Sequence, residues 1–272
     1  MIPSPHALDA LVEKTLSRVG ETVRGAVEYT GGVIVMALRG FRASFRRPLE
    51  IRSVVGQIET IGIQSMPIVI LTAAFTGMVM ALQYANGMAR FGAQMYTGKL
   101  VALSLTRELG PVLTSLMVGG RVGAGIAAEI GSMAVTEQID AIRALGADPV
   151  KKLVVPRVLA ALLIMPFLSV ITDVIGLAGG MLVSWLEFDI PMGFFVKSAL
   201  EVTTFDDFFS GISKTIFFGF IISIVGCHQG FRTRGGTEGV GRTTTEAVVV
   251  ISIGILICDY FLTKLFITFS NS

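Results

Sequence analysis

The sequence predicts an all-α, polytopic membrane protein with five transmembrane helices, an amphipathic interfacial helix before them and a short cytoplasmic helix among them. Only 15% of the 272 residues are charged, 52% are apolar, and the mean hydropathy is +0.73. Soluble domains carry about 25% charged residues, so this chain has too few polar side chains to cover a water-soluble surface. Residues 60–89 contain no charge, and a helix of that length measures about 45 Å, more than the roughly 30 Å hydrocarbon core.

The first 52 residues are expected to form an amphipathic leader at the membrane interface, ahead of a five-helix domain at residues 53–272. Apolar residues recur in this leader at helical spacing, with charged residues between them. The apolar positions are Leu8, Leu11, Val12, Leu16, Val19, Val23 and Val27. A soluble helix packed on a partner is the alternative. The segment lacks the short apolar core and small-residue cleavage site of a signal peptide.

Five membrane spans are expected at about residues 61–85, 100–130, 158–186, 215–231 and 247–269. Twelve Lys and Arg residues lie just before the first span and in the loops after the second and fourth, against five on the opposite side. Cytoplasmic loops carry the excess of basic residues, so the N-terminus is predicted to be cytoplasmic and the C-terminus extracytoplasmic. The acidic segment 187–207 is then an outside loop.

Small residues recur at every fourth position in the second and third spans. They are Gly119, Gly123, Ala127 and Gly131 in one stripe, and Gly176 and Gly180 in the other. Such stripes let helix backbones approach closely in lipid, so they predict packing faces.

A short amphipathic helix is expected at residues 134–145, between the second and third spans. Its apolar positions are Val135, Ile139, Ile142 and Leu145, and its charged positions are Glu137, Asp140 and Arg143. Gly146 is placed to end this helix in a left-handed conformation. Asp148 and Pro149 are typical of an N-cap and a first-turn proline, and so predict the start of the next helix. The short helix suits docking into a groove of a cytosolic partner, or resting on the membrane.

Four charges interrupt the second span: Arg107, Glu108, Arg121 and Glu129. A charge at the bilayer centre costs about 2.5–3.5 kcal/mol on insertion scales, so such residues face a protein interior or a wet cavity. Pro111 lies close by and favours a kink. The pair at 107 and 108 is interpreted either as a structural link between helices or as a polar element inside a transport cavity.

Asp173 and Asp259 also lie inside spans, and for these we favour structural hydrogen bonding.

Several kinds of site are excluded by the sequence. There is no G-x-x-x-x-G-K-[ST] phosphate loop, so the chain lacks that means of binding ATP and is not expected to be an enzyme. The two histidines are isolated, and no His or Cys pair has metal-ligand spacing. The net charge of +2 gives no indication of nucleic-acid binding.

The central block resembles a known family. LSLTRELGP at 103–111, GGRVGAGIAAEIGSM at 119–133, TEQIDAI at 136–142 and ADP at 147–149 closely resemble the MlaE/YrbE family of ATP-binding-cassette (ABC) transporter permeases. The resemblance extends over roughly residues 30–270.

This resemblance implies a permease subunit in the bacterial inner membrane, with a periplasmic C-terminus, that moves phospholipid between that membrane and a periplasmic MCE-domain protein. It implies a homodimer with two cytosolic ABC ATPase subunits, and a small cytosolic accessory protein among the candidate partners. No cofactor is expected on this chain, because ATP and Mg belong to the partner ATPase.

The resemblance also implies roles for single residues. The helix at 134–145 is similar to a coupling helix that docks into the ATPase, through Glu137, Ile139, Asp140, Ile142, Arg143 and Leu145. The lipid site would be bordered by Arg107, Glu108 and Lys214, with Met80, Met88 and Phe91 as apolar lining. The alternative for Glu108 is that it only pairs with Lys214 to brace two helices.

Two other functions compete with lipid transport. A secondary transporter or channel would use the intramembrane charges as an ion relay and need no ATPase. A structural scaffold would use them only for assembly.

Overall fold

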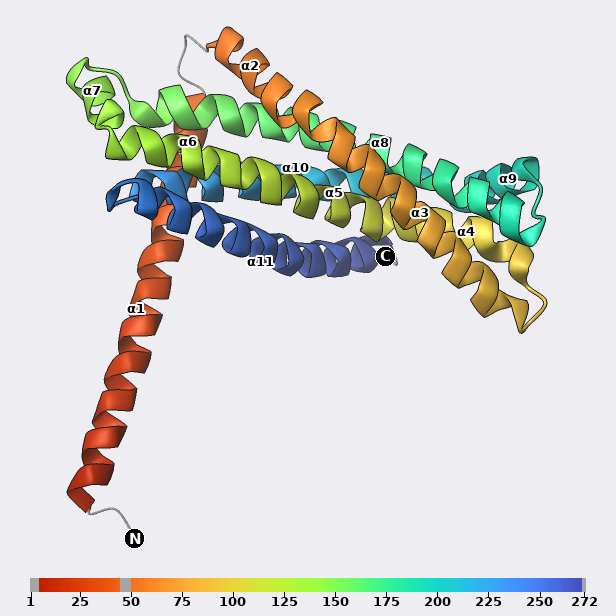
Figure 1. Ribbon diagram of the computed structural model, residues 1–272, viewed down its shortest axis with the longest axis horizontal. Helices are drawn as coiled ribbons and strands as arrows, with labels where there is room; N and C mark the ends of the chain where they lie inside the picture. Colours follow the sequence, from red (N-terminus) through yellow and green to blue (C-terminus); the bar gives the residue numbers. More distant parts are fainter. Residues whose placement is uncertain (1–4, 45–49, 271–272) are drawn as a thin grey trace.

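The computed structural model describes residues 5–44 and 50–270, and five of its helical runs are long and apolar enough to cross a membrane (Figure 1). The first run is α2 (Ile51–Ile61) with α3 (Met66–Ala89); the second is α4 (Thr97–Ser104), α5 (Gly110–Val118) and α6 (Ala124–Val135); the others are α8 (Val155–Phe188), α10 (Phe205–Arg232) and α11 (Gly236–Ser270). The all-α class and the five expected spans are confirmed.

In sequence, the helices extend beyond both ends of the apolar stretches from which they were predicted. The fourth span, expected near residue 215, starts at Phe205, because Thr204 and Asp207 form a capping box. The Thr204 hydroxyl accepts from the Asp207 N–H, and the Asp207 carboxylate accepts from the Thr204 N–H at 2.9 Å. A capping box satisfies amide groups that would otherwise be unpaired at a helix start, so the helix nucleates in polar sequence.

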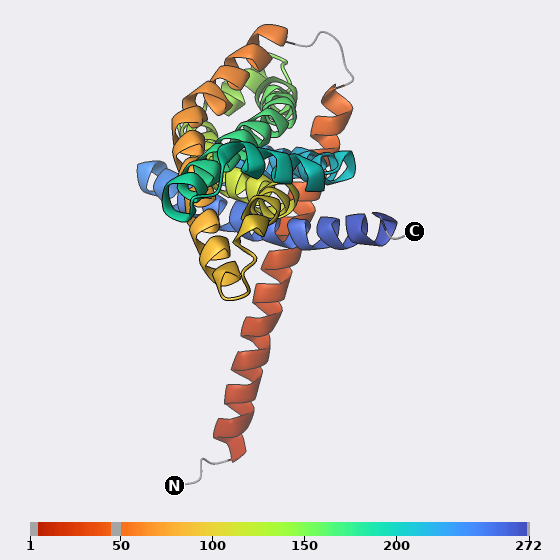
Figure 2. The same ribbon diagram turned by 90° about the vertical axis from the view of Figure 1, so that its right-hand side faces the viewer.

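The leader forms one long helix, α1 (Pro5–Ser44), whose N-terminal part projects away from the bundle (Figures 1 and 2), and the leader's last two residues already belong to α2. The side chains before Gly20, which include the first five predicted apolar positions, lie outside the described set. Val23 and Val27 are 56% and 65% exposed. The other end of α1 packs on the bundle, where Gly32 lies against His228 of α10.

Two π-helical turns interrupt the second run, at Leu105–Leu109 and Gly119–Gly123. The first contains Arg107 and Glu108, and the second contains Arg121. Each turn inserts a residue into the helix, and such turns are found frequently at functional sites. The sequence predicted a kink at Pro111 but not these turns.

Glycines hold the helices together, as the small-residue stripes predicted. A Cβ at Gly77 of α3 would collide with the Gly176 carbonyl of α8, and a Cβ at Gly123 would collide with Ile251 of α11. Buried apolar residues of the second run, α8, α10 and α11 form the main core, among them Val118, Ile130, Met165, Phe218 and Ile251.

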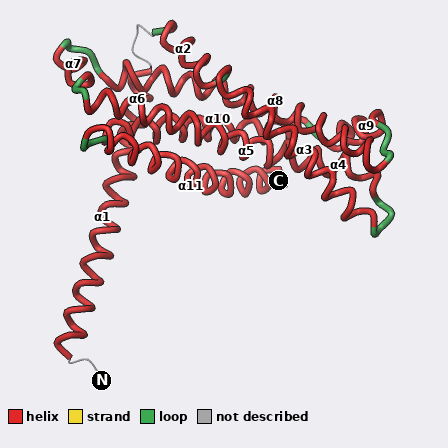
Figure 3. The backbone as a smooth tube through the Cα atoms, viewed as in Figure 1, coloured by secondary structure: helices red, strands yellow, loops and turns green. Residues whose placement is uncertain are grey.

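Short connections join the runs at the two ends of the bundle (Figure 3). One end carries α7 (Gln138–Ala144) and the α10–α11 turn, and the other carries the α3–α4 turn and α9 (Met192–Val202) (Figure 1). The segment 187–207, expected as a loop, therefore contains a helix, because α9 buries Phe195, Ser198 and Ala199.

The helix predicted at residues 134–145 is shorter than expected. Helix α6 continues to Val135, and Glu137 has a left-handed φ of 59°, so α7 begins only at Gln138. Gly146 has the expected positive φ, 78°. Asp148 Oδ1 accepts from the Val150 N–H at 2.9 Å, as an N-cap at the start of the next helix requires.

Candidate functional site

A cluster of charged side chains joins three helical runs inside the predicted membrane region, and Lys214 of α10 is at its centre. Lys214 is 1% exposed. Its Nζ donates to Glu108 Oε2 at 2.7 Å and to Thr263 Oγ1 at 2.7 Å, and forms an ion pair with Asp259 Oδ1 at 3.3 Å. Thr263 also donates to Glu108. The site therefore connects the second run, α10 and α11.

The π-helical turn also supplies a backbone acceptor to this cluster. Pro111 has no N–H to donate to the carbonyl of Arg107, four residues before it. Lys214 Nζ donates to that carbonyl at 3.0 Å. The proline therefore leaves an acceptor that a buried ammonium group uses.

Arg107, the neighbour of Glu108, pairs with a carboxylate of α10, the helix that also carries Lys214. Its Nε donates to Asp207 Oδ1 at 2.6 Å. Asp207 and Lys214 are seven residues apart, nearly two helical turns, so both lie on one side of α10. Arg107 and Glu108 are neighbours in the second run. Each thus pairs with a group of opposite charge on α10, and these two groups lie nearly two turns apart.

The cluster combines a buried cation with charges that reach the protein surface. The side chains of Glu108 and Arg107 are 39% and 55% exposed, and that of Asp259 is 20% exposed. Lys214 faces two carboxylates, those of Glu108 and Asp259, so these three side chains together have a net formal charge of −1. An ionic surface inside a span requires water, a partner protein or a polar ligand beside it.

The other two charges of the second run also have partners. Arg121 donates to Gln64 Oε1 at 2.9 Å and to Ser65 Oγ at 2.8 Å, at the short turn between α2 and α3. Arg157 of α8 pairs with Glu129 at 2.7 Å. These two sets of contacts link helices toward the α7 end of the bundle.

The structure brings together only part of the predicted lipid site. Arg107, Glu108 and Lys214 lie in one cluster. Met80 is 8% exposed and packs in a separate apolar cluster with Val101 and Phe195. Met88 is partly buried, and Phe91 is 79% exposed at the end of α3. The role of these three as lining stays a prediction.

Sequence reasoning missed Asp207 and Thr263 as members of the site. Their spacing along the chain could have identified them, because Asp207 lies seven residues before Lys214 and Thr263 lies four residues after Asp259. Both spacings put two polar groups on one side of a helix. Asp173, by contrast, is 5% exposed, and its Oδ1 has no hydrogen-bond partner in the described part of the chain.

Helix α7 has one anchored side and one free side. Ile139 is 4% exposed, and both Ile139 and Ile142 pack against the main core. Leu145 is 86% exposed, and Glu137 and Asp140 are exposed beside it. Arg143 donates to Asp140 at 2.8 Å.

The fold and the charged cluster together define a polytopic α-helical membrane protein with ionic groups inside its spans. Comparison with known proteins identifies the family. Residues 54–265 match the model described as Permease MlaE. A probable ABC transporter permease protein of Rickettsia bellii is 45% identical over 248 residues, which cover 91% of this chain and 96% of the relative.

Two further relatives come from Synechocystis and Arabidopsis thaliana. A probable ABC transporter permease protein of Synechocystis is 43% identical, covering 87% of each chain. The chloroplastic protein TRIGALACTOSYLDIACYLGLYCEROL 1 of Arabidopsis thaliana is 38% identical, covering 87% of this chain and 65% of that protein. The chain belongs to the MlaE permease family and is a membrane permease subunit of an ABC transporter.

Proposed function

We propose that this permease moves phospholipid between the bacterial inner membrane and a periplasmic MCE-domain protein. The observation that carries the proposal is the partly exposed charged cluster inside the spans. Glu108 and Arg107 present a carboxylate and a guanidinium at the surface, beside an ammonium group held in place by three hydrogen-bond acceptors and an ion pair with Asp259. A phospholipid headgroup has charges that match both.

A homodimer supplies the enclosure that one chain lacks. Two copies place their clusters on the walls of a shared cavity, and apolar side chains line it for the acyl chains. Exposing a methylene to water costs about 0.8 kcal/mol, so the apolar lining keeps the acyl chains out of water once the lipid has left the bilayer. The name of the Arabidopsis relative refers to a glycerolipid, which supports a lipid substrate.

The driving force comes from two copies of a cytosolic ABC ATPase, which bind ATP and Mg. Helix α7 acts as the coupling helix: Ile139 ties it to the core, and Leu145, Glu137 and Asp140 meet the ATPase. Closure of the ATPase narrows the cavity and lowers its affinity for lipid. Only such a difference in affinity between two states moves a substrate.

The α7 end is cytoplasmic in this proposal, with the N-terminus on the same side. Lys151, Lys152, Arg143 and Arg234 lie at or near that end. Basic residues are retained in the cytoplasm, so this end faces inward and the α9 end faces the periplasm.

Transfer of fluorescent phospholipid between proteoliposomes and the MCE protein, by the complete complex, tests the proposal. We expect Glu108→Gln to reduce ATP-dependent transfer about tenfold, since a hydrogen bond to a charged group contributes about 1.5 kcal/mol, while the complex stays assembled on size exclusion. A matched control is Glu246→Gln, in an exposed surface pair with Arg242 at 3.7 Å. Normal transfer by a Glu108→Gln complex that falls apart more easily would leave only the bracing role.

A further inference from the structure

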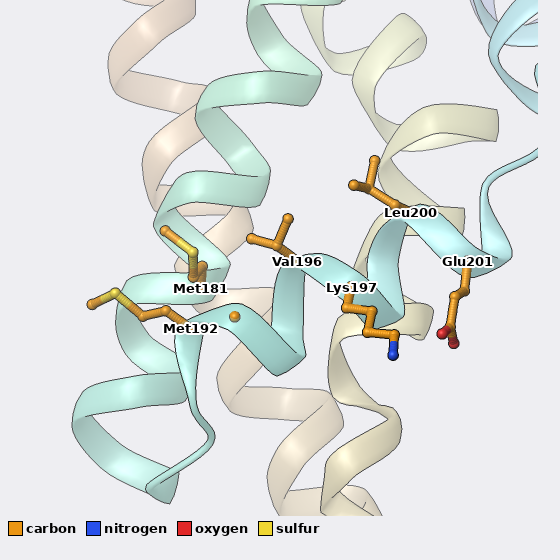
Figure 4. Close-up of a pocket in the computed structure, with 7 residues that line it drawn as sticks. Met181, Met192, Val196, Lys197, Leu200 and Glu201 are labelled. Carbon is orange, nitrogen blue, oxygen red and sulfur yellow. The ribbon is translucent and has the colours of Figure 1, made fainter.

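Two hollows of the structure lie outside the charged cluster. The larger, of about 730 Å³, is a groove between Met181 of α8 and one side of α9, and most of its lining is apolar (Figure 4). The smaller is a polar pocket of about 240 Å³ at the other end of the bundle, where α1, α10 and α11 meet (Figure 1). Its lining residues are Gly25, Tyr29, Gln229, Arg232, Arg242, Thr243 and Glu246. A water molecule occupies about 30 Å³, so the polar pocket has room for a small anion with several waters.

Gln229 supplies this polar pocket with a buried amide that has no partner. Gln229 is 5% exposed. Its backbone carbonyl accepts from Thr233 Oγ1 at 3.3 Å, but its side-chain amide forms no hydrogen bond with the described part of the chain. Burying an unpaired amide is unfavourable, so this side chain calls for a polar occupant of the pocket.

Tyr29 of α1 supplies a second unused group. Its hydroxyl is buried and has no hydrogen-bond partner among the described residues. The ring is held in place, because it packs edge-on against His228, with 5.0 Å between the ring centroids, and the Arg232 guanidinium lies 5.3 Å from its centroid. The hydroxyl is therefore a fixed donor at the wall of the pocket.

Two arginines line the pocket, and one of them has no counter-ion. Arg232 forms no ion pair with any residue of the described ranges, and its N–H groups lie in the plane of the guanidinium, so stacking on Tyr29 leaves them available to an acceptor. Arg242 pairs with Glu246 at 3.7 Å, a long contact between side chains that are 75% and 54% exposed. Glu246 therefore lies at the exposed rim, and both guanidinium groups have N–H donors to spare.

No general excess of positive charge surrounds the pocket. The charges on the neighbouring turns are two ion pairs, Arg24–Glu28 and Arg157–Glu129, and the exposed Glu21, Arg234 and Glu238. Together with the three charged lining residues, their formal charges cancel. An anion is therefore held here by the arrangement of donors on three helices and not by a positive field.

We propose that the pocket between α1, α10 and α11 binds a phosphate group. Arg232 and Arg242 donate to its oxygens, and the Gln229 amide and the Tyr29 hydroxyl complete the site. The guanidinium fork matches the spacing of phosphate oxygens, and a tetrahedral group with several acceptor oxygens satisfies donors that approach from different helices. The bound phosphate ties α1 to α10 and α11. The site is separate from the Lys214 cluster and does not depend on transport.

The test measures how fast phenylglyoxal modifies single arginines of the purified full-length chain, by peptide mass spectrometry in phosphate-free buffer. With inorganic phosphate at about ten times its Kd, Arg232 should react about tenfold more slowly, by mass action. Arg234 is exposed, lies outside the pocket lining and should react at an unchanged rate. Equal protection by sodium chloride of the same ionic strength would overturn the proposal.

A matched pair of glycine variants tests the pocket itself. Gly25→Glu places a carboxylate in the pocket without a collision, because a Cβ at Gly25 meets no atom within 4 Å, and should abolish the phosphate-dependent protection of Arg232. Gly31→Glu, in the same helix with equally open surroundings and outside the lining, should preserve it. Protection that survives Gly25→Glu would overturn the proposal.

Two phosphate sources are distinguished by comparing inorganic phosphate with dioctanoyl phosphatidic acid, with dioctanoylglycerol as the phosphate-free lipid. Protection at much lower concentrations of the phosphatidic acid would support a lipid headgroup as the occupant, and equal protection by both phosphates would support free phosphate. Protection by dioctanoylglycerol, or by neither phosphate, would overturn the proposal.

Discussion

Lys214 donates a hydrogen bond to the carbonyl of Arg107 at 3.0 Å, the carbonyl that Pro111 leaves without its usual partner. A helix defect and a buried charge thereby compensate each other. The ammonium group needs acceptors because it is 1% exposed, and the interrupted helix offers a backbone oxygen beside the Glu108 carboxylate. The π-helical turn and the ion cluster are therefore one structural unit.

Lys214→Met removes the charge and keeps most of the side-chain volume. Breaking a buried ion pair by removing one partner costs about 3–5 kcal/mol, because the carboxylates of Glu108 and Asp259 then lack their cation. We expect a clear fall in the melting temperature of the purified complex. Adding Glu108→Gln should recover part of it. Lys264→Met, at an exposed lysine of α11, is the control, and equal melting curves for both lysine variants would contradict the assignment.

Gly110→Ala should destabilise the fold through crowding between the second run and α8. A Cβ at this position would collide with Asp173 Oδ1 and lie 2.8 Å from the Leu105 carbonyl. Overpacking of this kind costs about 1–3 kcal/mol.

Thermal unfolding of the single and double variants measures the Gly110 effect. Gly110→Ala combined with Asp173→Ala should be more stable than the sum of the single changes, because the truncated side chain makes room. Gly120→Ala, where a Cβ meets nothing within 4 Å, should have no such coupling to Asp173→Ala. Strict additivity for the Gly110 pair would show that the collision is relieved elsewhere.

The five spans were predictable because hydrophobic length is a local property of the sequence. The same holds for Gly146 and Asp148, whose turn and cap depend on their own backbone and side chain. Glu137 was wrongly expected to lie inside the helix predicted at 134–145. A left-handed φ for a glutamate has no sequence signature, and at this position it separates α6 from α7.

Partners distant in the chain could not be read from local patterns. Arg107 and Asp207 are a hundred residues apart, and only the packing of α10 against the second run brings them together. Helix α9 was missed for a related reason: its Phe195 side is buried by α4, so its stability comes from tertiary packing rather than from a hydrophobic run of membrane length.

The orientation of the bundle can be tested with single cysteines at exposed positions of opposite ends, after Cys258 has been replaced by alanine. Leu145 is 86% exposed beside α7, and Phe91 is 79% exposed in the α3–α4 turn. In intact spheroplasts, an impermeant maleimide should label Phe91→Cys and spare Leu145→Cys until the membrane is permeabilised. The reverse pattern would invert the topology.

The coupling role of α7 predicts that the free and anchored sides of this helix respond differently to mutation. Leu145→Ala, Glu137→Lys or Asp140→Lys should weaken association with the ATPase and lower ATP-dependent lipid transfer, while the melting temperature of the permease hardly changes. Ile139→Ala should instead lower that melting temperature, since deleting a buried isoleucine side chain costs about 2–5 kcal/mol.

Co-purification of the ATPase with each α7 variant, together with ATP hydrolysis by the complex, measures these effects. The permease alone should hydrolyse no ATP, because its sequence has no phosphate loop. Gln138→Ala serves as a control, because Gln138 is exposed and hydrogen-bonds only locally, to Thr136 at 3.0 Å. Full association and activity after both charge reversals and the Leu145 truncation would place the ATPase contact elsewhere.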